Sequence, residues 1–454
     1  MRKSAMLFAA AIAAALSIPA AAGASGKPIP GQYIVVLKSS ANLDATVSDH
    51  RRGPKADVLM KYGAALKGYA AKLSPDGLAR VKADPRVDFV QQDVAGIAIM
   101  AKPAPAPPPP PPGQMLPTGV NRIDAELTSP TVLAGADGTR QTAGDVAVYD
   151  TGVQSTHPDL NVAGGVNCLG TYSNHDGTYN DQNGHGTHVA GIIGAKDNTV
   201  GSVGVAPNVR IWSVRTLNSI GSGSSSTQLC GINWITQNGP ALGIKVVNSS
   251  QVLFGYPDDG NCGYTRGDAL HQAICASTAA GILWVFGAGN SAASWANTSG
   301  PSFREVLTVT GMADRNGTPN VPNTTTFTCK PPGSSSSYSS QVDDKYASFS
   351  NWAVTAIDQS HVIAAPGACL YSTYKGSAYG YMSGTSMAGP HAAAVAHRCV
   401  LSGQCAGTPA ETIQKLRADA QAWNDANPSY GFTGDPRRPV TGRHYGNLIN
   451  AAGY

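Results

Sequence analysis

The chain has 454 residues, which is enough for one large hydrophobic core and a smaller second domain. Only 13% of the residues are charged and the formal net charge is +4, so nucleic acid and membrane surfaces are not expected as partners. The 52 glycines and 31 prolines indicate many tight turns and exclude a coiled coil or a long helical bundle.

Residues 1–24 have the pattern of a secretory signal peptide. Arg2 and Lys3 precede an apolar run that ends at Ile18, and the small residues at 22–24 fit a cleavage site. A membrane anchor is the alternative, but the run is shorter than the roughly 20 residues that span a bilayer. No later segment is long and apolar enough to span one. We therefore expect a secreted, extracellular protein without a membrane partner, and a monomer.

Residues 27–97 are predicted to form a small α+β unit. Its expected elements are a strand over 32–37, helices over 56–69 and 75–83, and a strand over 86–90. A run of six prolines from Pro107 to Pro112 follows, within the segment 101–113. Such a run is a stiff polyproline II spacer, and a ligand for a proline-recognition domain is the alternative.

From residue 114 to residue 454, short apolar strands alternate with helical patterns. We expect strands over 146–149, 211–214, 245–248, 282–286 and 306–309, and helices over 188–195, 268–280, 387–401 and 408–420. This alternation predicts an α/β fold, in which a parallel sheet is covered by helices on both faces. The serine-rich segment 324–338 is expected to be an irregular surface loop.

The eight cysteines all lie within this larger part of the chain. An even number in an exported protein favours disulfides over metal ligands, and the chain has no C-x-x-C pair. Two pairs would close the shortest loops, Cys399 with Cys405 and Cys262 with Cys275, and they are the first expected. The full connectivity stays open among Cys168, Cys230, Cys262, Cys275, Cys329, Cys369, Cys399 and Cys405.

Three glycine-rich segments offer an Asp, a His and a Ser in that order. They are VAVYDTG at 146–152, NGHGTHVAG at 183–191 and GTSMAGPH at 384–391. A serine hydroxyl is a poor nucleophile unless a base takes its proton and an acidic group orients that base. The three segments together therefore predict nucleophilic catalysis by a triad.

Taken alone, Asp150 and Ser386 each have a simpler interpretation than catalysis, whereas a metal-binding interpretation of His185 does not fit. Asp150, at the end of an expected strand, could be a turn residue, and Ser386 could only cap a helix. His185 and His188 do not fit a zinc-protease pair, which needs a spacing of four and an intervening Glu. In the catalytic interpretation Ser386 attacks a carbonyl carbon of the substrate, His185 transfers the proton, and Asp150 orients His185.

The sequences of all three segments resemble those of the subtilisin-like (subtilase) serine proteases, and the order Asp, His, Ser is that of subtilisin. The resemblance spans nearly the whole chain. It implies a secreted endopeptidase that acts on protein and peptide substrates. It also implies that the unit over 25–100 is an inhibitor-like propeptide, cut off near residues 99–101, which serves as intramolecular inhibitor and chaperone. The segment 101–113 would then be a proline-rich arm and 114–454 the catalytic domain.

The resemblance extends to an oxyanion residue and a calcium site. Asn290 matches the family's oxyanion asparagine, and the N–H of Ser386 would be the second donor. A tight Ca²⁺ site is implied by residues that fall where the family has its ligands, with oxygens of the kind that calcium prefers. These residues are Gln114, Asp159 and Asn198, with carbonyls of the loop that includes Lys196, Val200 and Ser202.

The segment 250–254 departs from the family. The family usually has Ser-Leu-Gly-Gly where this chain has SQVLF, so the shape of the specificity pocket is not implied. Two other functions predict different residues at the site. A catalytically dead binding protein would have a damaged triad, and a sedolisin-like acid peptidase would have an acidic base in place of His185.

Overall fold

The computed structural model describes residues 26–98, 113–125, 142–170, 178–320, 324–328 and 340–454. The predicted signal peptide, nearly all of the proline-rich arm and most of the predicted loop over 324–338 lie outside these residues, as does Cys329. Among the described residues, none of the helices combines the length and the apolarity that crossing a membrane requires.

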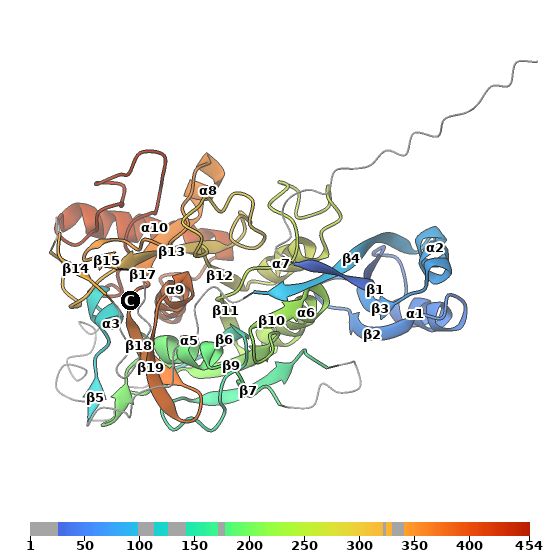
Figure 1. Ribbon diagram of the computed structural model, residues 1–454, viewed down its shortest axis with the longest axis horizontal. Coiled ribbons are helices and arrows are strands. Elements are labelled where there is room, and N and C mark those ends of the chain that lie inside the picture. Colours follow the sequence, from blue (N-terminus) through green and yellow to red (C-terminus); the bar gives the residue numbers. More distant parts are fainter. Residues whose placement is uncertain (1–25, 99–112, 126–141, 171–177, 321–323, 329–339) are drawn as a thin grey trace, which may run out of the picture.

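The amino-terminal unit is a four-stranded antiparallel sheet with two helices, at one end of the molecule (Figure 1). The strands lie in the order β4-β1-β3-β2, and the short strand β10 (Ser222–Ser224) of the larger body adds to the edge of β4. The elements in chain order are β1 (Lys27–Leu37), α1 (Leu43–Arg52), β2 (Asp57–Tyr62), β3 (Gly68–Lys72), α2 (Pro75–Ala83) and β4 (Val87–Ile97).

The helix predicted over 56–69 is wrong. This segment forms β2, a turn and the first residues of β3, and the first helix, α1, lies before it. Leucine, alanine, methionine and lysine favour helices, which explains the error. In the structure Val58, Met60 and Tyr62 alternate with less buried residues, as a strand packed on one face requires. Pairing with β3 outweighs the local helix preference.

The larger body is built on a mostly parallel sheet. Its order is β16-β13-β12-β11-β6-β9-β7, with β17 also paired with β13, and in this sheet only the β13–β16 pair is antiparallel among the described residues. The strands are β6 (Asp145–Asp150), β7 (Val162–Asn167), β9 (Arg210–Arg215), β11 (Ile244–Ser249), β12 (Leu283–Gly287), β13 (Leu307–Ala313), β16 (Lys345–Tyr346) and β17 (Val362–Pro366). The predicted α/β fold class is confirmed.

Helices cover both faces of this sheet. On one face, α5 (His185–Gly194), α9 (Thr385–Leu401) and α10 (Pro409–Ala426) share a buried core with Val146 and Val148 of β6. On the other face, α6 (Ser225–Leu242) and α7 (Ala269–Ala279) pack with Ala147 and Tyr149. The alternation along β6 thus divides the core in two. Ile34 and Tyr62 of the amino-terminal unit belong to the second cluster, so that unit packs on the α6 and α7 face.

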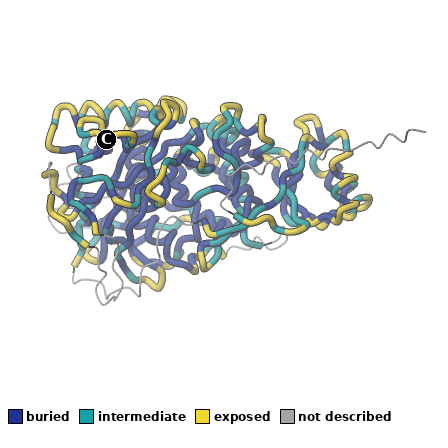
Figure 2. The backbone as a smooth tube through the Cα atoms, turned by 45° about the horizontal axis from the view of Figure 1, so that its top comes forward, coloured by how far each residue is buried: buried dark blue, intermediate teal, exposed yellow. Residues whose placement is uncertain are grey.

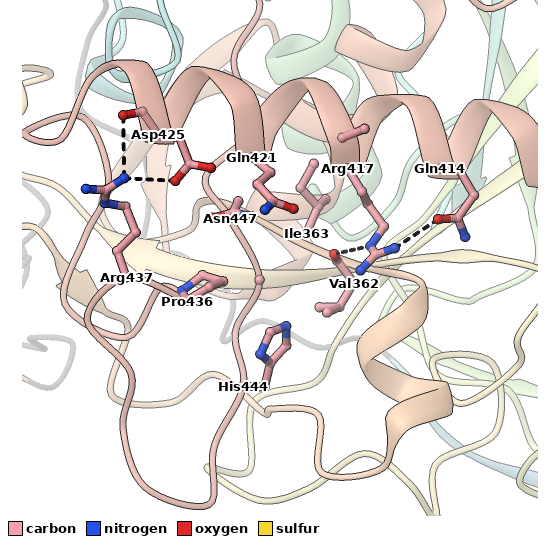
Figure 3. Close-up of a pocket in the computed structure, with 12 residues that line it drawn as sticks. Val362, Ile363, Gln414, Arg417, Gln421, Asp425, Pro436, Arg437, His444 and Asn447 are labelled. Carbon is pink, nitrogen blue, oxygen red and sulfur yellow. Dashed lines mark hydrogen bonds and ion pairs between the residues drawn. The ribbon is translucent and has the colours of Figure 1, made fainter.

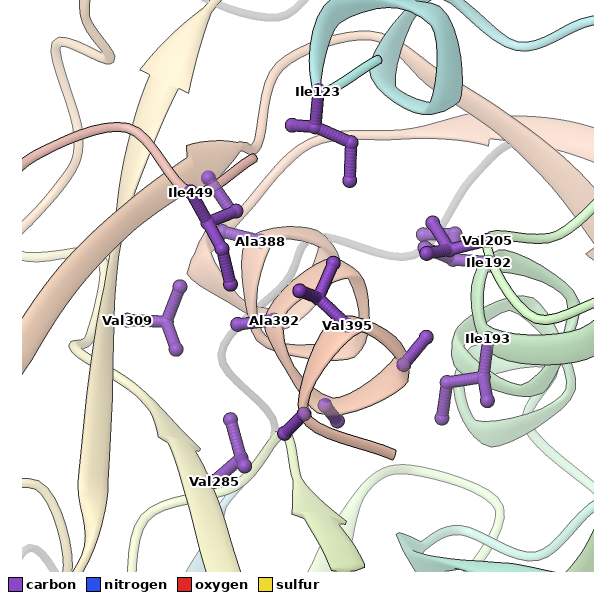
Figure 4. Packing of buried hydrophobic residues seen from close by; sticks show 14 of the residues in the cluster. Ile123, Ile192, Ile193, Val205, Val285, Val309, Ala388, Ala392, Val395 and Ile449 are labelled. Atoms are coloured by element: carbon purple, nitrogen blue, oxygen red, sulfur yellow. The ribbon is translucent and has the colours of Figure 1, made fainter. Parts of the chain in front are cut away.

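Helix α9 runs through the middle of the first cluster. Figure 4 shows its small residues Ala388 and Ala392 near Val309 of β13 and Val285 of β12. In Figure 2 the buried backbone fills the interior of the body, whereas exposed segments lie along its outer loops. The remaining short elements are β5 (Gln114–Met115), α3 (Thr118–Arg122), β8 (Gly201–Ser202), β14 (Thr326–Phe327), β15 (Gln341–Val342), α8 (Ala356–Ser360), β18 (Leu370–Tyr374) and β19 (Ala378–Met382).

Both disulfides that were expected first are present, Cys262–Cys275 and Cys399–Cys405. A third, Cys168–Cys230, joins the end of β7 to α6 across 62 residues of sequence. Closing a loop of this length restricts the unfolded chain more than the two short loops do.

A buried ion cluster ties α3 to the carboxy-terminal part of the body. The side chain of Arg122 is fully buried, 2.9 Å from Asp344 and 3.1 Å from Asp314. It also donates to the carbonyls of Tyr430 and Gly431. Because burial removes water from these carboxylates, they depend on the guanidinium for stabilisation.

We predict that Arg122→Leu lowers the free energy of unfolding by about 3–5 kcal/mol, since two buried carboxylates lose their cation. Chemical denaturation in a Ser386→Ala background, which removes the expected nucleophile, measures this. The matched control is Arg437→Leu. Arg437 forms an ion pair with Asp425 in which the two side chains are 39% and 53% exposed, respectively. That change should cost less than about 1 kcal/mol, and equal effects of the two variants would contradict the prediction.

Candidate active site

Asp150 and His185 are in contact at the carboxyl end of β6. Nδ1 of His185 lies 2.7 Å from Oδ1 of Asp150, and both side chains are fully buried. The same Oδ1 accepts the N–H of Thr151 at 2.7 Å. The carboxylate keeps the imidazole proton on Nδ1, and Nε2, which has no hydrogen-bond partner, is left to accept a proton.

Asp181, which sequence reasoning missed, fixes the start of α5. Helix α5 has no side-chain cap at Gly184. Instead Oδ1 of Asp181 accepts the N–H groups of Asn183 and Gly184, each at 2.8 Å, and Oδ2 accepts that of Thr187 at 2.9 Å. Burial raises the pKa of this carboxyl group. An acidic residue just before an expected helix start is the signal that could have revealed it.

Gly186 lets the start of α5 approach the end of β6. A Cβ atom at this position would lie 2.1 Å from the carbonyl oxygen of Gly152 and 3.2 Å from Oδ1 of Asp150. No side chain fits at these distances, because the first contact is with backbone. The contact between Asp150 and His185 therefore requires glycine next to the histidine.

Ser386 lies in the first turn of α9 and is fully buried. Its hydroxyl donates to the carbonyl of Ser250 at 3.3 Å, and no hydrogen bond joins it to His185. Ser250 in turn donates to the carbonyl of Ser386 at 2.8 Å. The structure thus brings Asp150 and His185 together and seats Ser386 against the segment after β11. Hydrogen bonds between catalytic groups often form fully only when substrate is bound.

Asn290 follows β12 and is fixed from the start of α9. Its Oδ1 accepts the N–H of Thr385 at 2.8 Å, and the Thr385 hydroxyl accepts the N–H of Gly289 at 2.9 Å. With its oxygen engaged in this way, the amide has its NH₂ group left to donate. The residue adjacent to Ser386 therefore orients Asn290.

The end of β4 lies beside this site in an extended conformation. Residues Ala95–Ile97 pair with β10. Ala98 donates to the carbonyl of Gly221 at 2.9 Å and accepts the N–H of Val252 at 3.1 Å. Val252 is two residues from Ser250, the contact of Ser386, so the amino-terminal unit runs along the strand segments that surround the candidate catalytic residues.

The same unit also caps two helices of the larger body. Asp93 accepts the N–H of Ser226 at 3.0 Å, at the start of α6, and Gln91 accepts the N–H of Ala269 at 3.0 Å, at the start of α7. These N–H groups have no partner within their own helices. The amino-terminal unit thus satisfies backbone donors of the larger body.

Five of the six residues expected at the calcium site gather in the structure. Nε2 of Gln114 donates to the carbonyls of Lys196 (2.8 Å) and Ser202 (3.1 Å). Asp159 accepts from Asn198 at 2.6 Å and from the N–H of Ser202 at 3.2 Å. For Val200, the structure gives only the bond from its N–H to Asn198.

The oxygen atoms of the residues at the expected calcium site suit a hard cation. Desolvation by burial raises the pKa of Asp159 from 3.8 to about 7, so its negative charge lacks sufficient compensation. A carboxylate, two side-chain amides and backbone carbonyls are oxygen ligands of the mixed kind that Ca²⁺ takes. The residue types therefore fit a calcium ion. In the structure the amide nitrogens of Gln114 and Asn198 face the oxygens of the site, so both amides would have to turn their oxygens toward the ion.

A separate cavity of about 450 Å³ lies beside α10, away from these residues (Figure 3). Arg417 and Arg437 line it, but their guanidinium groups are engaged, with the carbonyl of Val362 at 3.2 Å and with Asp425 at 2.8 Å. None of the candidate catalytic residues lines this cavity.

Comparison with known proteins decides the family. A model described as "Subtilase family" matches residues 144–433, and one described as "Peptidase inhibitor I9" matches residues 32–95. The chain belongs to the subtilase family. It is a subtilisin-like serine endopeptidase with an amino-terminal propeptide of the I9 type.

Characterised relatives match most of the chain. M-protease of Shouchella clausii (strain KSM-K16) is 32% identical over 362 residues, which cover 80% of this chain and 76% of the relative. Subtilisin DY of Bacillus licheniformis is 36% identical over 62% of this chain and 84% of the relative. Subtilisin E of Bacillus subtilis (strain 168) is 29% identical over 86% of this chain and 85% of the relative.

Proposed function

We propose that this protease is secreted, removes its own propeptide and then cleaves protein and peptide substrates with Asp150, His185 and Ser386 as its catalytic residues. The observation that carries the proposal is the 2.7 Å contact between buried Asp150 and His185, with Nε2 of His185 unbonded. The signal-peptide pattern supports export. The propeptide would comprise 25–100, the proline-rich arm 101–113 and the catalytic domain 114–454.

In this mechanism the Ser386 hydroxyl turns from the Ser250 carbonyl towards His185 and attacks the scissile carbonyl carbon. His185 takes the proton at Nε2 and returns it to the leaving amine, so that the peptide bond breaks and an acyl-enzyme forms. Water, deprotonated by His185, then releases the acid and restores Ser386. Asp150 holds the imidazole in place and stabilises its charged form. The N–H of Ser386 and the NH₂ of Asn290 are the proposed donors to the oxyanion.

The contacts of the propeptide support two proposed roles, as an inhibitor and as a folding aid. Its end runs between Gly221 and Val252, where an extended peptide substrate would lie. Asp93 and Gln91 satisfy the first N–H groups of α6 and α7, which supports the start of two helices during folding. The position of the propeptide along the site supports both proposed roles.

Ser386→Ala should abolish self-processing, so that the product keeps its propeptide, and should abolish labelling by a serine-directed fluorophosphonate. Mass spectrometry of the product and of the labelled peptide measures both effects. Ser402→Ala, which changes a serine just after α9, is the control and should process and label normally. Labelling of the unchanged protein at another serine would contradict the assignment.

Asn290→Ala should lower kcat by roughly 10²–10³ with little change in KM, because the lost hydrogen bond forms mainly in the transition state. Steady-state kinetics on a peptide substrate measures the two constants. A higher KM at constant kcat would show instead that Asn290 binds the substrate ground state.

We also propose a structural Ca²⁺ held by Gln114, Asp159, Asn198 and the carbonyls of Lys196, Val200 and Ser202. The support is the convergence of these groups around a buried carboxylate. The ion would join β5 to the loop before β8. Because it would bind only the folded chain, it would stabilise that chain by RT ln(1 + [Ca²⁺]/Kd). Its expected role is stability, since the ligands are not those of the catalytic mechanism.

The raised pKa of Asp159 gives this site a pH signature. When a chelator has removed calcium, Asp159 of the folded chain is protonated at pH values between 3.8, its ordinary pKa, and about 7, its pKa in the folded chain. Asp159 of the unfolded chain is ionised over this pH range. Stability should therefore fall as the pH rises through this window, by up to about 1.4 kcal/mol per pH unit. Saturating calcium keeps Asp159 ionised and should remove the contribution of Asp159 to this dependence.

Thermal unfolding of the Ser386→Ala protein, in calcium and in chelator across this pH range, measures the effect. Asp159→Asn is the matched variant: it should not respond to calcium, and it should lack the part of the pH dependence that calcium removes, while other buried carboxyl groups such as Asp314 keep theirs. Identical pH profiles with and without calcium would contradict the site, as would a chelator response that persists in Asp159→Asn.

A further inference from the structure

The side chain of Ala98 is enclosed, whereas that of its neighbour is not. Ala98 is 1% exposed and Ile97 is 64% exposed. The backbone of Ala98 is held on both sides, by the carbonyl of Gly221 and the N–H of Val252. Because alternate side chains of an extended strand point in opposite directions, this pairing directs Ala98 into the protein and Ile97 outward.

Leu217 and Phe254 form the wall around Ala98. Both are buried, at 0% and 1% exposure, and they make a separate apolar cluster with Ala98, to which Val94 and Val252 add. Leu217 donates its N–H to the carbonyl of Asp150 at 3.3 Å, so this wall is anchored next to the candidate triad. Ala98 contributes a single methyl group to this cluster.

A buried amide ladder keeps Phe254 in position. Oε1 of Gln228 in α6 accepts the N–H of Phe254 at 2.9 Å, and its Nε2 donates to the carbonyl of Val252 at 2.7 Å and to Gln251 at 3.1 Å. Gln251 donates in turn to the carbonyl of Tyr149 at 3.1 Å. The segment 250–254, where this chain departs from the usual family sequence, is therefore held rigidly.

We propose that Phe254, fixed by Gln228 and packed with Leu217, restricts this protease to substrates with an alanine-sized side chain at the position that Ala98 occupies. The inference rests on the proposed function, because it takes the bound end of the propeptide as a guide to how a substrate lies. A larger side chain would overlap two immobile walls. The neighbouring position, occupied by Ile97, faces outward and should accept side chains of any size.

The test uses the mature enzyme and a synthetic peptide with the sequence of residues 92–103. Peptide variants carry Ala98→Gly, Ala98→Ser, Ala98→Val or Ala98→Leu, and the matched controls carry Ile97→Ala or Ile97→Lys. Cleavage is followed by mass spectrometry, which gives kcat/KM and identifies the bond that is cut. We expect Ala98→Leu to lower kcat/KM at the original bond by about 10–200-fold, while Ala98→Gly, Ala98→Ser and both Ile97 variants stay close to the parent.

Enzyme variants then locate the selectivity. Phe254→Ala should raise the ratio of kcat/KM for the Ala98→Leu peptide to that for the parent peptide by about tenfold or more. Leu217→Ala provides a second enlarged pocket if Phe254→Ala does not fold. Because the readout is a ratio between two peptides, a general loss of activity does not change it.

Equal cleavage of the parent and Ala98→Leu peptides at the same bond would overturn the proposal, as would an unchanged ratio in a folded enzyme with an enlarged pocket. Failure of the proposed function is distinguishable from either result. It would appear as no cleavage of the parent peptide and no fluorophosphonate labelling at Ser386.

Discussion

The close approach of α5 to the end of β6 is the constraint on which the rest of the site depends. Residue 186 lies so near the carbonyl of Gly152 that only glycine fits, and the imidazole beside it reaches Asp150 for this reason. Asp181 then fixes the first turn of α5, where it accepts the N–H of Thr187. It also accepts a hydrogen bond from the hydroxyl of Thr151, the residue next to Asp150. A helix start and a strand end are thus joined by backbone packing and by one carboxylate.

The parts of the site that were predictable are those that depend on parallel strands. The sequence placed Asp150 at the carboxyl end of a strand, and in the sheet β6 lies between β9 and β11, in parallel register with both. Because the active sites of open α/β sheets form at this edge, Asp150, the segment after β11 and Asn290 after β12 meet there. The apolar pattern of the strands was sufficient for this expectation.

Other features depend on contacts between segments that are distant in sequence. The strand β2 has residues with good helix propensity, and its pairing with β3 and packing on α6 decide its conformation. Helix α6 was not predicted, since its polar and small residues give little periodicity. The roles of Asp181 and of Gln228 depend on hydrogen bonds to backbone groups that only the fold brings near. The orientation of the Ser386 hydroxyl towards Ser250 is likewise a property of the folded chain.

The short strand β10 has a consequence for what the enzyme can cut. It offers its edge to the propeptide over Ser222–Ser224, so a chain that replaces the propeptide must present free backbone N–H and C=O groups in an extended form. In a folded protein the helices and interior strands have already paired these groups. Such segments have to open before they can add to the edge, and where opening is fast relative to cleavage, the rate follows the population of the opened form. The rate of cleavage would therefore depend on the local stability of the substrate. Marginally folded proteins would be cut much faster than well-folded proteins that have the same sequence at the cleavage site.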